Sequence, residues 1–148
     1  MKQSKQFVLI IFLVSLIALV LGGCSRDKAK NIQLGKATYE AIWKGDGSAE
    51  NSIDWESLKY NDQELGTQYK QIPGSFDKAE FRRYTMSKIA ADLKSKGWSP
   101  GNVRNWRTRE FVTFRTIITA DAPKGTVNVT ISVTPTGQRL VTAIETKI

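Results

Sequence analysis

The side chains that most enzymes use for nucleophilic, acid–base or metal chemistry are scarce in this sequence. Its 148 residues include one cysteine, Cys24, and no histidine. Ser-His-Asp and Cys-His catalysis are therefore excluded, as are zinc sites built on cysteine and histidine and haem ligation by histidine. No glycine-rich phosphate loop and no Asp-x-Asp-x-Asp-Gly calcium loop occur either. Carboxylate chemistry is what remains, so we expect a protein that is not an enzyme and that uses no cofactor and no metal.

The single cysteine follows a leader with the layout of an export signal. Lys2 and Lys5 precede an uncharged, apolar run at residues 7–23, and a basic start followed by such a run is typical of export signals. The motif Leu21-Gly22-Gly23-Cys24 resembles the lipobox of bacterial lipoproteins. The resemblance implies cleavage before Cys24, diacylglycerol on its thiol and often acylation of the new amino group. Two or three acyl chains anchor a protein stably, since each buried CH₂ contributes about 0.8 kcal/mol.

The leader has two alternative interpretations, an uncleaved transmembrane helix and an ordinary secretory signal. The apolar run covers seventeen positions, at the lower end of the roughly 17–25 that a spanning helix needs. Both alternatives also place the rest of the chain outside the cytoplasm. We predict a signal peptide at residues 1–23 and a protein anchored by lipid on the extracytoplasmic side of the plasma membrane or the outer membrane.

The mature chain is predicted to form one domain. Residues 24–30 are short and polar and are interpreted as a tether, and residues 31–148 have the length of a single compact domain. One cysteine allows no disulfide within the chain, so the core alone must hold the domain together. The charge is uneven: residues 24–76 hold 7 basic and 8 acidic side chains (net −1), whereas residues 77–148 hold 13 and 6 (net +7).

Helical periodicity predicts three helices in the first part of the domain. The first covers residues 31–44 and is followed by a turn at 45–47, where glycine favours the left-handed end of a helix. A shorter second helix is predicted over residues 48–60. The segment 61–75 is polar, contains Pro73-Gly74 and is predicted to be irregular. We expect the buried positions of the second helix to be Ile53, Trp55 and Leu58.

The third helix begins at Asp77 and Glu80, which form a capping-box pattern. Its apolar residues recur at i, i+3, i+4 and i+7, which places them on one face. Gly97 predicts the end of the helix. The buried face is predicted to contain Met86, Ile89, Ala90 and Leu93, widened by Phe81 and Tyr84.

After residue 101 the pattern changes to the two-residue period of strands. Residues 103–120 are rich in Thr, Phe, Val and Ile and are predicted as one long strand with a bend or bulge, followed by a hairpin loop at 121–125. Residues 126–134 alternate apolar and polar, which is typical of an antiparallel strand with one face on a core and one in water. A turn at 135–137 leads to a last strand. The inner residues predicted for these last two strands are Val127, Val129, Ile131, Val133, Leu140, Ile144 and Ile148.

Helices first and an antiparallel meander last predict an α+β domain with the helices on one face of the sheet. Residues 37–46, Ala-Thr-Tyr-Glu-Ala-Ile-Trp-Lys-Gly-Asp, resemble the first helix of nuclear transport factor 2-like, or cystatin-like, domains. Those domains wrap a curved antiparallel sheet around such a helix to form a cone. The resemblance implies that the curved sheet serves as a surface for a protein partner or a second copy.

A basic and aromatic stretch at residues 104–115 is the first candidate binding site. Arg107, Arg109 and Arg115 are predicted on one face of an extended strand, with Trp106, Val112 and Phe114 on the other. Arginine forks suit phosphate or carboxylate groups, and aromatic rings can stack on a ligand. The alternative is a solvated sheet face over a packed apolar one. Nucleic acid is a poor partner for an exported domain, so the anions we expect are lipid headgroups or cell-wall polymers.

A pocket at the open end of the cone is the second candidate site. Tyr39, Trp43 and Trp55, with Tyr60 nearby, could line it beside surface carboxylates, and in nuclear transport factor 2-like enzymes a carboxylate in that cavity acts as a base. The alternative is a set of core aromatics. We therefore expect a non-catalytic binding or assembly module at the membrane, in contact with another envelope protein or with itself. A small-ligand carrier or pocket enzyme is the alternative.

Overall fold

The computed structural model describes residues 25–148, so the predicted signal peptide and Cys24 lie outside the described residues. The chain divides between Lys30 and Asn31 into two units. In the first unit, residues 25–30 are helical. Among residues 25–148, no helix is long and apolar enough to cross a membrane. The second unit, which contains all the elements below, is described by itself.

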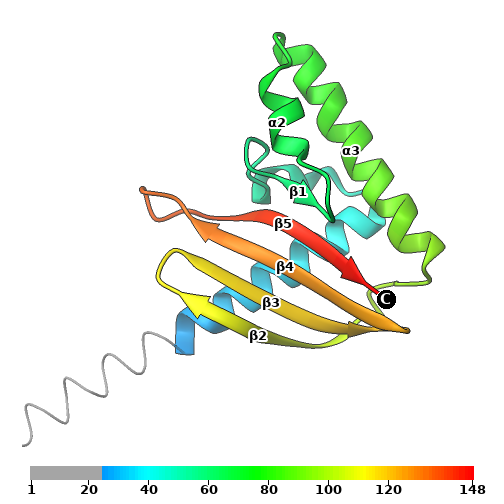
Figure 1. Cartoon of the computed structure of the whole chain (residues 1–148), viewed down its shortest axis with the longest axis vertical. Helices are drawn as coiled ribbons and strands as arrows, with labels where there is room; N and C mark the ends of the chain where they lie inside the picture. The colour runs from blue at the N-terminus through cyan, green and yellow to red at the C-terminus, as the bar shows by residue number, and fades with distance from the viewer. Residues whose placement is uncertain (1–24) are drawn as a thin grey trace, which may run out of the picture. The chain divides into compact units, whose positions relative to one another are not determined.

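Five strands of the second unit form one open, curved, mixed sheet in the order β1-β5-β4-β3-β2 (Figure 1). Consecutive strands from β2 to β5 pair antiparallel. An antiparallel meander was predicted for this part of the chain, although with β2 and β3 as one strand. The short first strand pairs parallel with β5 at one edge, which makes the sheet mixed rather than purely antiparallel. The strands are β1 (Lys59–Tyr60), β2 (Arg104–Val112), β3 (Arg115–Ala122), β4 (Gly125–Val133) and β5 (Arg139–Lys147).

The single long strand predicted over 103–120 is wrong, because the chain reverses at Thr113-Phe114 and forms two strands. Val112 pairs directly with Arg115, so the turn has only two residues. It contains no glycine, proline or asparagine, the residues that normally mark such turns. A bend was predicted correctly within this stretch: the β2 register shifts twice, and Asn105 has φ 56°.

On β4 the apolar residues of the alternating pattern lie on the inner face of the sheet, as predicted. Val127, Val129 and Ile131 are at most 1% exposed, whereas Val133, also predicted on this face, is only half-buried. On β5 the prediction fails in part: Ile144 is buried, but Leu140 is only half-buried and Ile148 is exposed, while Val141 is buried. The cause is a register shift opposite Thr130 and Ile131, which breaks the two-residue period between Val141 and Ile144.

Residues 31–44 are helical and cover the inner face of the sheet. A Cβ atom on Gly35 would lie 2.2 Å from Cδ1 of Ile118, so the helix backbone approaches β3 closely. The buried Asn31 Nδ2 donates to Thr116 Oγ1 at 2.9 Å. Figure 1 shows this helix, in blue to cyan, behind the strands, with no described helix over their other face. The predicted α+β fold, with helices packed against a curved sheet, is confirmed.

The helix predicted over 48–60 is wrong. A 3₁₀ helix, η1 (Gly47–Ser52), is followed by an extended segment in which Ile53 bridges to Val141 before β1 begins. The expected burial of Ile53, Trp55 and Leu58 nevertheless holds. The irregular segment predicted over 61–75 contains a helix, α2 (Leu65–Lys70), whose Leu65, Gly66 and Tyr69 are buried.

The third predicted helix is α3 (Ser75–Ser95), with Gly74 as its N-cap and no side-chain cap. The capping box is therefore wrong: Asp77 lies inside the first turn, where its charge favours the helix dipole without capping the end. The predicted face is buried at Met86, Ile89, Ala90 and Leu93. Phe81 is half-buried, but Tyr84 is 61% exposed. Gly97, with φ 70°, follows the end of the helix as predicted.

Gly66 tests the packing of α2 against the segment before β1. A Cβ at this position would lie 2.4 Å from the backbone oxygen of Glu56. Although alanine favours helix, we expect Gly66→Ala to lower the free energy of unfolding by about 1–3 kcal/mol, because backbone must move to admit the methyl group. Gly47→Ala is the matched control, since nothing lies within 4 Å of its Cβ, and it should change stability by less than about 0.5 kcal/mol. Urea unfolding of both variants is the measurement, and equal stabilities would contradict this packing.

Candidate functional site

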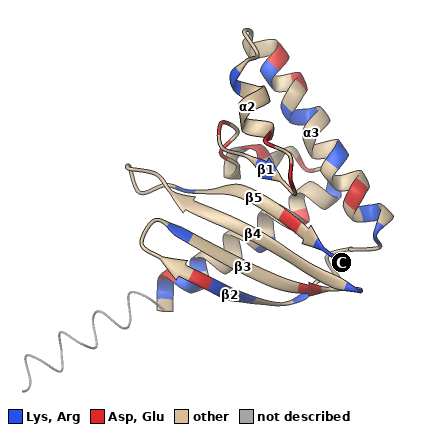
Figure 2. Ribbon diagram, viewed as in Figure 1, with Lys and Arg blue, Asp and Glu red and all other residues tan. Residues whose placement is uncertain are grey.

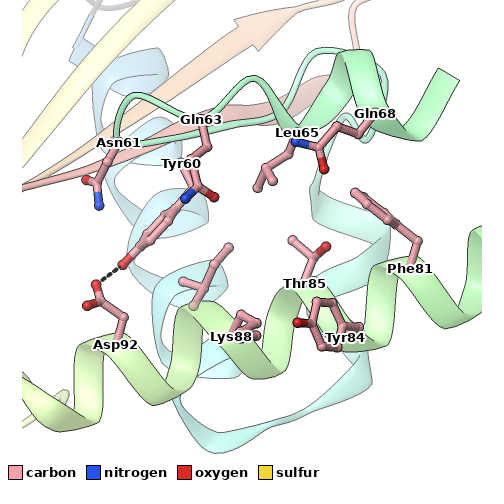
Figure 3. Close-up of a pocket in the computed structure, with 11 residues that line it drawn as sticks. Tyr60, Asn61, Gln63, Leu65, Gln68, Phe81, Tyr84, Thr85, Lys88 and Asp92 are labelled. Atoms are coloured by element: carbon pink, nitrogen blue, oxygen red, sulfur yellow. Dashed lines mark hydrogen bonds between the residues drawn. The ribbon is translucent and has the colours of Figure 1, made fainter. Parts of the chain in front are cut away.

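A hollow of about 460 Å³ lies between α3 on one side and the β1–α2 segment on the other (Figure 3). We call it the α2–α3 hollow. One wall is the segment after β1 together with α2, and the opposite wall is a single face of α3. Its lining residues are Tyr60, Asn61, Gln63, Leu65, Gln68, Phe81, Tyr84, Thr85, Lys88, Ile89 and Asp92.

The two walls offer different chemistry. The β1–α2 wall presents the primary amides of Gln63 and Gln68, each of which can donate and accept hydrogen bonds. The α3 wall presents the rings of Phe81 and Tyr84, which provide apolar surface, with the hydroxyl of Thr85 between them (Figure 3). The hollow can therefore bind a molecule that has both an apolar face and hydrogen-bonding groups.

A hydrogen-bonded network closes one end of the hollow. The hydroxyl of Tyr60 donates to Asp92 Oδ2. Lys96 Nζ donates to the same oxygen at 2.5 Å and to Thr146 Oγ1 at 2.9 Å. The backbone N–H of Thr146 donates to Asn61 Oδ1 at 2.7 Å. Through these contacts α3 is joined to both β1 and β5.

The network also fixes the protonation states of its members. Burial acts to raise the pKa of Asp92, but the hydrogen bonds from Lys96 and Tyr60 outweigh it, so the pKa is lowered. Burial, and then the hydrogen bond to Asp92, raise the pKa of Tyr60. At neutral pH Asp92 is a carboxylate and Tyr60 is neutral. A general base works best with a pKa near the working pH, and the pKa of Asp92 is shifted away from it.

The three predicted arginines do not form one free cationic patch. Arg107 Nη2 lies 2.9 Å from Asp121 Oδ1, and Arg115 Nη2 lies 2.6 Å from Glu110 Oε1. The hydrogen bonds from Asn105 and Arg107 lower the pKa of Asp121, which keeps that pair charged. Arg109 lies at the second register shift of β2, is exposed and, in the part of the chain described, has no ion pair.

The apolar face predicted opposite these arginines is formed only by Trp106. Its ring packs edge-on against Tyr39, with 5.6 Å between the centroids. Val112 and Phe114 are 48% and 70% exposed instead, because the register shifts and the turn interrupt the alternation on which the prediction rests.

The structure places the aromatics predicted to line a pocket in or against the core. Tyr39 is 1% exposed and donates its hydroxyl to the Trp98 carbonyl oxygen. Trp55 is 8% exposed, with Nε1 donating to the Glu50 carbonyl oxygen at 3.1 Å. Trp43 is half-buried under the ammonium group of Lys94, 5.2 Å from the ring centroid. None of the three lines the α2–α3 hollow, whereas Tyr60, considered with them, does.

Sequence reasoning missed the hollow, although a signal was present. Phe81, Tyr84, Lys88 and Asp92 follow one another at helical spacing on α3, beside its buried face.

Within the described residues no group of three or more Asp, Glu or Cys side chains could hold a metal ion. No model of a known protein family, no curated protein and no solved structure matches this chain.

The lowered pKa of Asp92 predicts that the stability of the protein depends on pH in a specific way. Because its pKa is lowered in the folded protein, its contribution is complete above the ordinary carboxylate pKa and is lost as pH falls through the folded pKa. We expect Asp92→Asn to destabilise the protein by about 1 kcal/mol at neutral pH, a modest value because both members of the pair with Lys96 are partly exposed. The difference from the unsubstituted protein should shrink from about pH 4 downwards.

Thermal melts at a series of pH values measure this difference. Asp62→Asn is the matched control, since Asp62 is an exposed carboxylate outside the network. An Asp92→Asn protein whose stability differs from the original by the same amount at all pH values would contradict the assigned role.

Proposed function

We propose that this protein is an exported lipoprotein, held on the extracytoplasmic side of a membrane by acylated Cys24, and that it acts as a non-catalytic binding module of the cell envelope. The observation that carries the binding role is the α2–α3 hollow, which combines aromatic rings with side-chain amides. The membrane role is supported by the basic start, the apolar run and the motif Leu21-Gly22-Gly23-Cys24.

Binding is favoured over catalysis by the state of the one carboxylate in the hollow. Asp92 Oδ2 already accepts hydrogen bonds from Tyr60 and Lys96, and the lowered pKa keeps Asp92 ionised. The core aromatics Tyr39 and Trp55, expected around a catalytic cavity, have little surface to offer a substrate. The pocket-enzyme alternative therefore has less support than the binding role.

The lining favours an uncharged ligand. Of the two charged residues of the hollow, Asp92 is held in its ion pair with Lys96, and the ammonium group of Lys88 lies 5.3 Å from the Tyr84 ring centroid. The amides of Gln63 and Gln68 suit hydroxyl or amide groups, and the ring of Tyr84 suits the apolar face of a sugar. We propose an uncharged, hydroxyl- and amide-bearing molecule, such as the glycan of a cell wall, as the ligand class.

A second role as a protein-contact surface is favoured by the outer face of the sheet. No described helix covers it (Figure 1), and Figure 2 shows that charged residues are found on β2 and towards the ends of the other strands, with few in their middle. Among its central residues Thr119 and Asn128 are buried, at 7% and 3% exposed, and Thr130 is half-buried. Nuclear transport factor 2-like domains, which the first helix resembles, use this kind of face for a second copy or another protein. We propose an envelope protein or a second copy as the partner.

Nitrogen-15 NMR titration with chitotriose, an uncharged probe that carries hydroxyl and amide groups, tests the ligand class. We expect the side-chain NH₂ signals of Gln63 and Gln68 to shift. Tyr84→Ala removes a ring that is 61% exposed, so the fold should persist while Kd rises about three- to tenfold, the loss expected for one stacked ring.

Gln138→Ala provides the control, because this exposed glutamine lies in the β4–β5 turn and should leave Kd unchanged. Shifts that map to another surface, or a Tyr84→Ala protein that binds as tightly as the original, would contradict the proposed site.

A further inference from the structure

The turn between β2 and β3 carries two exposed apolar side chains. Phe114 is 70% exposed and Val112, its neighbour across one residue, is 48% exposed. Arg109 is exposed nearby on β2, and residues 104–115 together hold four arginines and one glutamate. We call Val112, Thr113 and Phe114, with Arg109, the hairpin tip. An exposed aromatic next to unpaired positive charge is the composition of membrane-interface segments.

The hairpin tip lies at the end of the domain where the chain enters it. Asn31 Nδ2 donates to Thr116 Oγ1 at 2.9 Å, and both residues are 2% exposed, so the start of helix 31–44 is fixed two residues from Phe114. Cys24 precedes Asn31 by seven residues, which span at most about 25 Å when fully extended. The opposite end of the sheet, the β3–β4 turn at Lys124, is about 25 Å further along β3.

From this placement we infer that the hairpin tip docks on the surface of the bilayer that holds the anchor, with Phe114 and Val112 at the boundary between headgroups and acyl chains and Arg109 at lipid phosphates. The inference rests on the proposed anchoring through Cys24. An anchor within seven residues of Asn31 keeps this end of the domain near the bilayer. The exposed ring of Phe114 and the guanidinium group of Arg109 then meet the chemistry that they suit.

A second copy is a weaker candidate for the same surface. Pairing of two β2 edges would bring the arginines of residues 104–115 against those of the other copy, and like charges across a strand pair are destabilising. An anionic lipid surface has the complementary charge.

Docking through the hairpin tip would also orient the α2–α3 hollow. The N–H of Val133 donates to the Phe114 carbonyl oxygen at 2.9 Å, and Val133 pairs with Arg139, so β5 begins near the hairpin tip. Tyr60 of the hollow pairs with Ile144, five residues further along β5, or about 16 Å. The hollow is thus held away from the bilayer, where a ligand outside the membrane can reach it.

Fluorescence of the full, acylated chain in vesicles tests the docking. With Cys24 blocked by lipid, a cysteine introduced by Thr113→Cys is the only free thiol and can carry an environment-sensitive dye beside an intact Phe114. The vesicles contain phosphatidylcholine alone or with about 30 mol% phosphatidylglycerol. We expect the dye to shift to shorter wavelength and to be quenched by spin-labelled lipid, more strongly in the anionic vesicles.

Lys124→Cys, in the exposed β3–β4 turn, is the matched control and should report water in both vesicles. Adding Phe114→Ser should abolish the wavelength shift of the dye at position 113. Adding Arg109→Glu should make that shift equal in neutral and anionic vesicles. Vesicle flotation separates the two proposals. Protein that floats while both dyes report water overturns the docking and leaves the anchor standing, whereas protein that does not float overturns the anchor and the docking with it.

Two other outcomes also overturn the docking on lipid. The dye shift could require a high density of protein on the vesicle and be equal in neutral lipid. That result would show that the hairpin tip contacts a second copy of the chain. A shift that appears only when an anionic cell-wall polymer is added assigns it to that polymer.

Discussion

The hydroxyl of Tyr39 donates a 2.5 Å hydrogen bond to the carbonyl oxygen of Trp98, 59 residues along the chain, and both residues are 1% exposed. Trp98 Nε1 in turn donates to the Pro123 carbonyl oxygen at 2.9 Å. Helix 31–44, the segment that follows α3 and the β3–β4 turn therefore meet at two buried rings. Burial raises the pKa of Tyr39, which keeps its hydroxyl a donor. In a chain without a disulfide, this contact holds the helices to the sheet.

The α2–α3 hollow follows from that arrangement. Once Trp98 is fixed, the last turns of α3 are held beside β5, where Lys96 and Asp92 reach Thr146 and Tyr60. The first turns of α3 extend past the edge strand β1 and face α2 across the space that Phe81 and Tyr84 line. The core reaches the hollow through Tyr60, Leu65 and Ile89, whereas the buried aromatics Tyr39, Trp55 and Trp98 do not line it.

The sequence allowed the elements with an uninterrupted period to be predicted: helix 31–44, the buried face of α3, and β4. The β2–β3 turn could not be predicted, because Thr113-Phe114 carries none of the usual turn residues. The inner face of β5 could not be predicted either, because a register shift changes the phase of the alternation. The start of α3 was misplaced for a related reason, since Gly74 takes the cap position that Asp77 was expected to fill.

The candidate site was harder to predict than the fold. Tyr60 and Asp92 are separated by 32 residues, and their contact depends on a two-residue strand that pairs with the far end of the chain. Aromatic residues alone do not tell a core from a pocket, so Tyr39 and Trp55 were assigned to a cavity that they do not line. The arginines were expected on one strand, but the turn at Thr113-Phe114 divides them between β2 and β3. The ion pairs of Arg107 with Asp121 and of Arg115 with Glu110 depend on a register that the sequence does not fix.

The proposed place of this domain at a membrane surface depends on one sulfur atom, that of Cys24, and the most direct measurement is the intact mass of the protein purified from its native membrane. The mass predicted is that of a chain that begins at Cys24 and carries two or three acyl chains. A free thiol at Cys24, or a leader that is still attached, would contradict it.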